Sequence, residues 1–178
     1  KGVAAALLMA NFQALIQNLI YQYRDLETFV FALNQSVYRI TKADKFITFF
    51  IAEIDTDLKT MRYINAGHYP PVMVNGGEML RLDQGSTFIG AFEKLPYINE
   101  EIINLDGEAM ILSFTDGLAE LQDESGAYFD DDKIEDFVKE HQKRSPDEFN
   151  EELLNEIDRF RGGKEYSDDI AILTCKIY

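Results

Sequence analysis

The chain has 178 residues, of which 46% are hydrophobic and 28% charged, and its formal net charge is −15. This composition is typical of a globular protein, while the negative charge excludes sequence-independent nucleic-acid binding and disfavours an anionic membrane surface, because phosphate groups would be repelled. The single cysteine, Cys175, excludes an internal disulfide and a cysteine-rich zinc site, and its alternation with Leu173 and Ile177 predicts a buried thiol.

Two helices are predicted at the N-terminal end of the chain. Apolar residues recur at helical spacing over residues 1–22, where several alanines permit close packing, and again over residues 24–40. Asp25 stands at the start of the second helix, where its carboxylate can accept hydrogen bonds from amide groups of the first turn. We therefore expect Asp25 to be the N-cap of that helix.

The chain then changes to runs rich in β-branched and aromatic residues, which predict β-strands. These strands are expected over residues 46–55, 61–67, 70–74, 78–82, 97–104, 111–114 and 170–177. Asn75-Gly76-Gly77 separates the third strand from the fourth. Because asparagine and glycine tolerate positive φ angles, this tripeptide predicts a hairpin turn.

Two amphipathic helices, over residues 132–142 and 146–161, are predicted before the final strand. Pro146 suits a first helical turn, and Ser145 suits the N-cap before it. The order of helices, antiparallel meander, helices and returning strand is typical of an α+β layered fold rather than of alternating βαβ units. The sequence has no internal repeat and no low-complexity linker, so we expect residues 1–178 to form one domain.

The sequence contains no apolar run long enough to cross a membrane, and no signal peptide is visible. We therefore expect a cytoplasmic protein, or a cytoplasmic domain of a larger one, without membrane contact. The first residue is Lys1 rather than Met, which leads us to expect natural sequence upstream.

Two aspartates lie where predicted strands end or begin. Asp116 follows the strand over residues 111–114 and Asp168 precedes the last strand, so both reach one sheet edge if these strands are neighbours. Carboxylate oxygens suit hard divalent cations such as Mg²⁺ or Mn²⁺, and Gly117 would let the backbone approach such a cluster without steric cost. The alternative is that Asp116 makes a turn and Asp168 caps a strand. The residues alone leave both interpretations open.

Four segments resemble the motifs of one enzyme family. SFTDGLAEL (113–121) and SDDIAIL (167–173) are similar in order and spacing to the two C-terminal metal motifs of the PPM family, the metal-dependent Ser/Thr phosphatases. NAGHYPP (65–71) and KGVAAALLMA (1–10) resemble motifs of its bacterial SpoIIE-like branch, which includes RsbU-type regulators. The four matches are in the family's order and span nearly the whole chain.

The resemblance implies an αββα sandwich of antiparallel sheets flanked by helices, from which the N-terminal strands are missing here. It implies hydrolysis of phosphoserine or phosphothreonine on a bacterial regulatory protein, in signal transduction, by a water that Mn²⁺ or Mg²⁺ ions activate. Asp116 and Asp168 carry over as metal ligands, and no other residue of the chain carries over as catalytic. The implied partner is a phosphorylated regulator such as an anti-anti-sigma factor, and a homodimer is left open.

The same resemblance places further metal ligands before Lys1, among them a bridging aspartate. We therefore expect the chain alone to bind metal weakly or not at all and to be inactive, whereas the full-length protein is an enzyme. The alternative is a non-catalytic module with a phosphatase fold, used for signalling or dimerisation. Acidic residues at the corresponding upstream positions would favour the enzyme.

Overall fold

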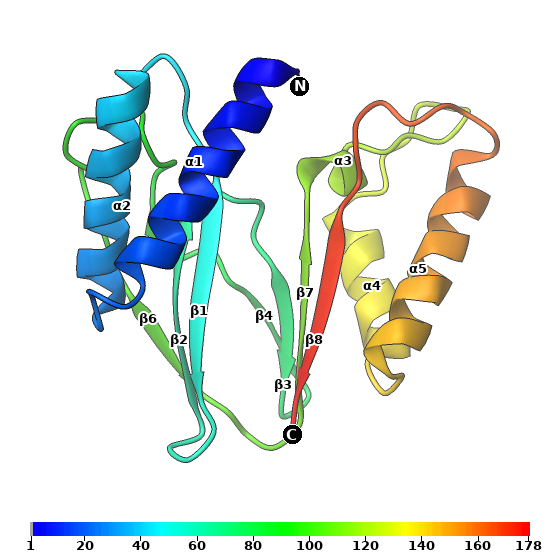
Figure 1. Ribbon diagram of the computed structural model, residues 1–178. Helices are drawn as coiled ribbons and strands as arrows, with labels where there is room; N and C mark the ends of the chain where they lie inside the picture. Colours follow the sequence, from blue (N-terminus) through cyan, green and yellow to red (C-terminus); the bar gives the residue numbers. More distant parts are fainter. Residues whose placement is uncertain (1) are drawn as a thin grey trace. The chain divides into compact units, whose positions relative to one another are not determined.

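Helices and strands are segregated along the chain, and the α+β class expected from the sequence is confirmed (Figure 1). The computed structural model describes residues 2–178, and within them it contains five helices and eight strands. The helices are α1 (Val3–Leu19), α2 (Leu26–Thr41), α3 (Asp116–Ala119), α4 (Asp131–His141) and α5 (Pro146–Arg161). The strands are β1 (Phe49–Asp55), β2 (Thr60–Ala66), β3 (Val72–Asn75), β4 (Glu78–Arg81), β5 (Gly85–Ser86), β6 (Glu101–Asn104), β7 (Ala109–Phe114) and β8 (Ile172–Ile177).

The chain divides into two compact units, each with its own sheet and its own apolar core. The first unit runs to His68 and resumes over Gln84–Ile103. The second unit comprises Tyr69–Asp83 and Asn104–Tyr178. We describe each unit by itself and call them the α1–α2 unit and the α4–α5 unit.

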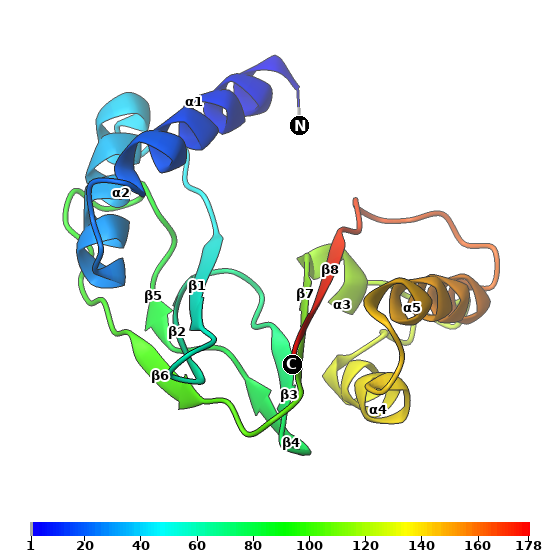
Figure 2. The ribbon, with the colours of Figure 1, turned by 60° about the horizontal axis from the view of Figure 1, so that its bottom comes forward.

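The α1–α2 unit contains a sheet in the order β1-β2-β5, with β6 also paired to β2. Strands β1 and β2 are antiparallel along their whole length, whereas the two-residue strand β5 is parallel to β2. Helices α1 and α2 pack against each other and against the sheet, as Figure 2 shows. The core between them is built from Phe12, Leu19, Leu26, Phe29, Val30, Leu33, Val37, Ile64, Ala66 and Ile89.

The α4–α5 unit contains a fully antiparallel sheet in the order β4-β3-β7-β8. Helix α4 contacts β3, and α5 contacts β8. The inward residues of both helices share one apolar cluster with the sheet, which includes Val72, Leu112, Phe114, Leu118, Ile134, Phe149, Leu153 and Ile157. Burial of these side chains supplies the main favourable free energy for the packing of this unit.

The local signals for helix ends and for the hairpin are confirmed. Asp25 caps α2, and its carboxylate accepts a hydrogen bond from the Thr28 amide at 2.8 Å. Ser145 is the N-cap of α5 and forms a capping box in which the Glu148 carboxylate accepts from the Ser145 amide at 3.0 Å. The turn between β3 and β4 has positive φ at its two glycines, as its sequence predicted.

Three short features differ from the expectations. The strand predicted over residues 97–104 covers only Glu101–Asn104. The backbone before it is held in a loop, because the Ser86 hydroxyl donates to the Tyr97 carbonyl at 2.6 Å and the Asn99 amide donates to the Gly85 carbonyl at 3.0 Å. Strand β5 and helix α3 were not predicted, since two and four residues are too short for a periodic pattern.

The prediction that Cys175 is buried is wrong, because its thiol is exposed. Successive side chains of β8 point to opposite faces, which places Leu173 with Cys175 and Thr174 on the other side. Helix α5 covers the face of Thr174, whose hydroxyl donates to Asn150 Oδ1 at 2.6 Å. Leu173 on the opposite face is 68% exposed, although Ile177 at the end of that face is buried, so the face covered along the middle of β8 is the one that carries Thr174.

Over the part of the chain that the structure describes, no helix combines the length and the apolar character needed to cross a bilayer.

Candidate functional site

Strands β7 and β8 are neighbours, as the sequence analysis required. They pair antiparallel from Ala109↔Ile177 to Phe114↔Ile172, so the end of β7 lies beside the start of β8. Asp116 comes two residues after β7, and Asp168 comes four residues before β8. The segments that carry the two aspartates therefore lie at the same end of this strand pair.

Thr115 ties the two segments together. Its amide donates to the Ala171 carbonyl at 3.1 Å, and its hydroxyl accepts from the Ala171 amide at 3.0 Å. The same hydroxyl donates to the Asp169 carbonyl at 3.1 Å. Thr115 is the N-cap residue of α3, but its side chain makes no capping hydrogen bond and reaches across to the other segment instead.

Gly117 is needed for a steric reason. A Cβ atom at this position would lie 2.6 Å from the Asp169 carbonyl oxygen, which is too close for any real side chain. No positive φ is involved, in contrast to the glycines of the hairpin turn. The expected close approach is present, but what approaches Gly117 is the backbone of Asp169.

The two predicted ligands are both exposed, and each accepts a hydrogen bond from the amide that follows it. Asp116 Oδ1 accepts from the Gly117 amide at 3.0 Å, and Asp168 Oδ1 accepts from the Asp169 amide at 2.7 Å. Within residues 2–178, no three or more His, Cys, Asp or Glu side chains form a group that could hold a metal ion. A pair of carboxylates suits part of the shell of Mg²⁺, which keeps several waters and commonly takes one or two protein carboxylates. The residues present thus fit a hard divalent cation in donor type.

Other acidic segments that could suggest a metal site have local structural roles. Asp130 caps α4 by accepting from the Lys133 amide at 3.2 Å. Asp55 ends β1, and its carboxylate accepts from the amides of Asp57 and Leu58 at 3.0 and 2.8 Å. Both carboxylates are occupied in turns or caps, as expected for Asp at such positions.

Sequence reasoning gave no role to Thr115, although it lies directly before Asp116. A hydroxyl residue at the junction of a strand and a helix is usually read as an N-cap, so the residue type was not informative. Its partners are Asp169 and Ala171, which lie 54 and 56 residues further along the chain. Only the pairing of β7 with β8 reveals this contact.

Comparison with known proteins gives a consistent result. The family model described as Stage II sporulation protein E (SpoIIE) matches residues 1–178. No curated protein is similar enough in sequence to count as a match.

Three similar solved structures share the fold at low sequence identity. The SiaA-PP2C domain of Pseudomonas aeruginosa has a TM-score of 0.86 at 20% identity, over 99% of this chain and 72% of that chain. The PP2C phosphatase domain of SpoIIE from Bacillus subtilis, with a fragment of its regulatory domain, has a TM-score of 0.79 at 16% identity, over 98% of this chain and 50% of that chain. RsbX in complex with magnesium has a TM-score of 0.65 at 18% identity, over 98% of this chain and 74% of that chain.

Proposed function

The chain belongs to the SpoIIE family, and from this premise we propose that it is part of a metal-dependent protein Ser/Thr phosphatase that acts in bacterial signalling. The family membership and the fold shared with PP2C phosphatase domains support this reaction class. The observation on which the proposal depends is the pairing of β7 with β8, which carries Asp116 and Asp168 to one end of the same strand pair.

In this proposal Asp116 and Asp168 are ligands of Mn²⁺ or Mg²⁺. When bound, the ion supplies an activated water and offsets negative charge on the phosphoryl oxygens. Thr115 fixes the spacing of the two segments through its bonds to Asp169 and Ala171. Gly117 leaves room for the Asp169 backbone, so that the loop before β8 can lie against the start of α3. The magnesium complex of the similar protein RsbX supports the choice of a hard divalent cation.

The proposed substrate is a phosphoserine or phosphothreonine residue on a bacterial regulatory protein. An anti-anti-sigma factor is the specific partner that we propose. We also propose that residues 1–178 belong to a single phosphatase domain and that this domain works in the cytoplasm. The match of the family model to the full chain supports the single domain.

The direct test is Mn²⁺-dependent hydrolysis of a phosphoserine peptide by the full-length protein. Asp116→Asn and Asp168→Asn should each lower kcat/KM by more than about 100-fold, because even outer-shell partners of metal ligands contribute 10-fold to 100-fold. Asp57→Asn is the matched control, since Asp57 is an exposed aspartate in the turn after β1, in the other unit. Full activity in both ligand variants would remove these two aspartates from the mechanism.

The alternative function is a non-catalytic signalling or dimerisation module. It predicts that the full-length protein hydrolyses no phosphoserine or phosphothreonine peptide with either Mn²⁺ or Mg²⁺. Isothermal titration with Mn²⁺ gives a second readout, since loss of binding in Asp116→Asn would still identify a metal site in an inactive protein. Sedimentation of the full-length protein with and without Mn²⁺ tests the homodimer.

A further inference from the structure

Three phenylalanines form a row of contacting rings on the surface of the α1–α2 unit. The ring centroids of Phe46 and Phe88 are 4.6 Å apart, and those of Phe88 and Phe92 are 6.4 Å apart with the rings stacked. Phe46 is 58% exposed and Phe92 is 46% exposed, while Phe88 between them is half-buried. We call these three side chains the aromatic row. Exposed apolar surface of this kind marks interaction sites on soluble proteins.

The two segments that carry the aromatic row are fixed to each other and to α2. Ile47 and Ile89 exchange two backbone hydrogen bonds of 2.8 Å, which join the segment after α2 to the segment after β5. The buried side chain of Asn34, on α2, accepts from the Gly90 amide at 2.8 Å and donates to the Phe92 carbonyl at 3.0 Å. The row is therefore in place before any partner binds, which lowers the entropic cost of docking.

Gly90 allows the segment after β5 to lie directly against α2. Its φ is +91°, and a Cβ atom there would lie 2.5 Å from Val37 Cγ1 and 3.3 Å from the Lys45 carbonyl oxygen. Val37 belongs to α2, and Lys45 directly precedes Phe46. The close packing at Gly90 thus brings both ends of the aromatic row onto one side of α2.

The surroundings of the aromatic row are positively charged. Residues 39–46 and 88–94 carry four basic and two acidic side chains, a net charge of +2 in a chain of net charge −15. A cavity of about 420 Å³ reaches the residue that follows Phe92, and it is lined by Gln35, Tyr38, Arg39, Lys42 and Glu93. Neither Arg39 nor Lys42 forms an ion pair or a side-chain hydrogen bond within residues 2–178. Because these two cations outnumber the single carboxylate of the lining, the cavity favours an acidic group.

The sign of this charge argues against a second copy of the chain as the partner. In a dimer with two-fold symmetry the same surface lies on both sides of the interface, so two positive surfaces would face each other. A contact between copies without this symmetry would leave one row open and continue into a filament. An acidic segment of a different protein meets neither obstacle.

We propose that the aromatic row and the adjoining cavity, together called the docking surface, bind an acidic segment of a partner protein that presents an apolar side chain. The apolar side chain packs on the rings of Phe46 and Phe92, and a neighbouring carboxylate pairs with Arg39 or Lys42. Aromatic residues and arginine are enriched at protein interfaces. The inference does not depend on the proposed reaction, because the docking surface belongs to the α1–α2 unit, whereas Asp116 and Asp168 belong to the other unit.

The test measures the binding of three fluorescein-labelled peptides to the full-length protein by fluorescence anisotropy. The first peptide carries leucine and phenylalanine between glutamates. The second has alanines in place of the two apolar residues, and the third has lysines in place of the glutamates. The first peptide should bind about fivefold more tightly than either of the others, the size expected when one substantial interface contact is lost.

Variants of the protein test each part of the docking surface. Phe92→Ala should weaken binding of the first peptide about fivefold, whereas Phe92→Tyr, which keeps an aromatic ring, should bind it nearly as the wild type does. Arg39→Glu combined with Lys42→Glu should remove the preference over the lysine peptide. Leu154→Ala and Lys143→Glu are the matched controls, since both residues are exposed and lie in the α4–α5 unit.

Each other outcome overturns the proposal. Absence of binding by all three peptides, or equal binding of the acidic and basic peptides, would remove the docking surface and leave the proposed phosphatase reaction in place. Binding that Phe92→Ala leaves unchanged would place the peptide elsewhere on the protein. Self-association that Phe92→Ala abolishes, measured by sedimentation, would assign the aromatic row to a second copy instead. Thermal unfolding of each variant checks that the fold is retained.

Discussion

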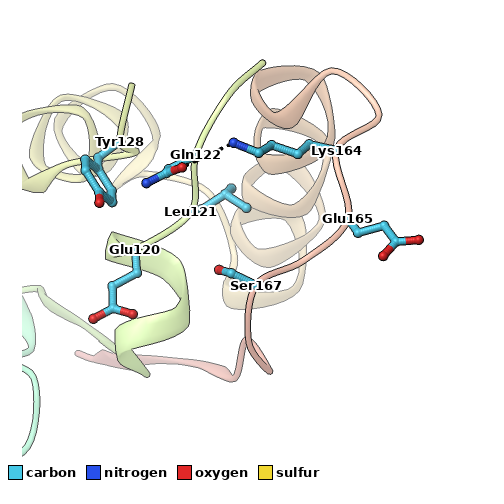
Figure 3. A pocket seen from close by; sticks show the side chains of 7 residues that line it. All are labelled: Glu120, Leu121, Gln122, Tyr128, Lys164, Glu165 and Ser167. Atoms are coloured by element: carbon cyan, nitrogen blue, oxygen red, sulfur yellow. Dashed lines mark hydrogen bonds between the residues drawn. The ribbon is translucent and has the colours of Figure 1, made fainter. Parts of the chain in front are cut away.

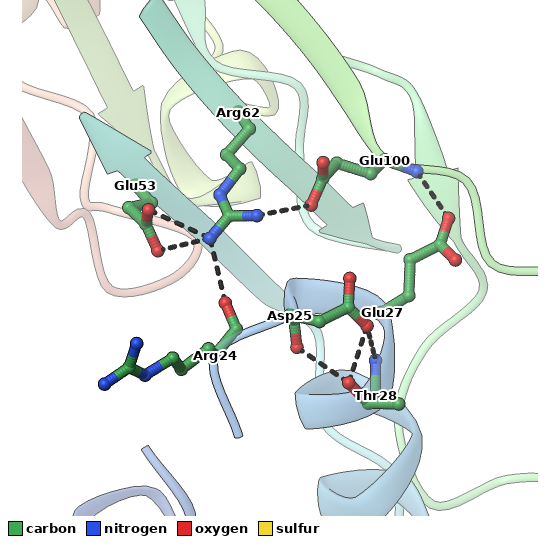
Figure 4. Close-up of polar contacts among 7 residues, drawn as sticks. All are labelled: Arg24, Asp25, Glu27, Thr28, Glu53, Arg62 and Glu100. Atoms are coloured by element: carbon green, nitrogen blue, oxygen red, sulfur yellow. Dashed lines mark hydrogen bonds and ion pairs between the residues drawn. The ribbon is translucent and has the colours of Figure 1, made fainter. Parts of the chain in front are cut away.

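In the α1–α2 unit Arg62 lies among carboxylates, whereas at the β7–β8 end of the other unit Asp116 and Asp168 accept hydrogen bonds from backbone amides. Figure 4 shows the first arrangement. Arg62 Nη2 donates to both oxygens of Glu53 at 2.9 Å and to the Arg24 carbonyl at 2.8 Å. Its Nη1 atom lies 3.8 Å from Glu100 Oε2.

Under the proposed function, this difference separates acids that stabilise the fold from acids that hold an external cation. In the Arg62 cluster the cation belongs to the chain itself, and hydrogen bonding by Glu53 raises the pKa of the guanidinium further. The Asp116 carboxylate instead accepts a hydrogen bond from the Gly117 amide, and the segment that carries it is tied to the Asp169 backbone by Thr115. Asp116 Oδ1 and Asp168 Oδ1 each accept from an uncharged backbone amide, whereas both oxygens of Glu53 accept from a guanidinium group. Counting acidic residues would not have distinguished the two regions.

The largest effect is expected for Gly117→Ala. Its Cβ would meet the Asp169 carbonyl oxygen at 2.6 Å, so the loop before β8 must move. Overpacking of this kind costs about 1–3 kcal/mol of the free energy of unfolding. We expect a loss at the upper end of this range in urea unfolding, together with a large fall in phosphopeptide hydrolysis, because Asp168 lies in the displaced loop.

Gly107→Ala is the control that separates steric contact from backbone strain. Gly107 has a φ of +86°, but a Cβ there would meet no atom within 4 Å. This variant should lose about 1 kcal/mol of stability from the strained φ and keep its hydrolytic activity. Equal losses of activity in the two variants would contradict the role assigned to the contact between Gly117 and Asp169.

The next effect tests the Arg62 cluster. Arg62→Met keeps most of the aliphatic volume but removes the cation beside Glu100, whose side chain is only 16% exposed. A partly buried carboxylate without its cation should lower the free energy of unfolding by about 1–2 kcal/mol in thermal or urea unfolding. Arg159→Met removes an arginine that also contacts two carboxylates but is 64% exposed, and it should cost less than about 0.5 kcal/mol. Similar losses in both variants would show that burial does not distinguish the two clusters.

Several elements could be predicted because their signals are local. The cap of α5 is encoded in Ser145, Pro146 and Glu148, and the hairpin turn is encoded in two adjacent glycines. The pairing of the Asp116 and Asp168 segments was expected if two strands were neighbours, and a resemblance between motifs supported it. The contacts that fix this pairing were not predictable, because Thr115 and Asp169 are 54 residues apart.

Burial was harder to predict than the elements themselves. The alternation along β8 was read correctly, but alternation does not say which face a helix covers, and Cys175 proved to be exposed. A cavity of about 500 Å³ beside the end of α3 was equally unpredictable, because the loop after α3 and the loop after α5 form it together (Figure 3). A single sequence gives no signal that two such loops meet.

A smaller effect is expected for the Thr115 hydroxyl. Thr115→Val keeps the shape of the side chain but removes the bonds to the Asp169 carbonyl and the Ala171 amide. We expect a loss of about 1 kcal/mol in urea unfolding, the usual net value of such hydrogen bonds, with a clear fall in Mn²⁺ affinity by titration calorimetry. Thr115→Ser retains the hydroxyl and should stay close to wild type in both measurements. A Val variant with normal Mn²⁺ affinity would mean that Thr115 does not position the ligands.

The smallest effect distinguishes the two carboxylates on Arg62. Burial raises the pKa of Glu100 above its usual value of 4.5 despite the attraction of Arg62, and the nearby carboxylates of Asp25, Glu27 and Glu53 act in the same direction as burial. Its Oε2 atom is buried and accepts no hydrogen bond from the described residues. The folded state therefore binds a proton at the Glu100 carboxylate more readily than the unfolded state does. Ionised Glu100 lowers the free energy of unfolding at pH values above its folded pKa, and this penalty disappears as the pH falls towards 4.5.

Glu100→Gln should therefore raise the melting temperature at pH 7 and leave it nearly unchanged near pH 4.5. Glu53→Gln should instead lower the free energy of unfolding at pH 7 by about 0.2–1 kcal/mol, because it weakens a partly exposed ion pair that makes two hydrogen bonds. Melting temperatures of both variants across this pH range give opposite signs if the cluster works as described. A destabilised Glu100→Gln variant at pH 7 would show that the attraction of Arg62 outweighs the burial of the carboxylate.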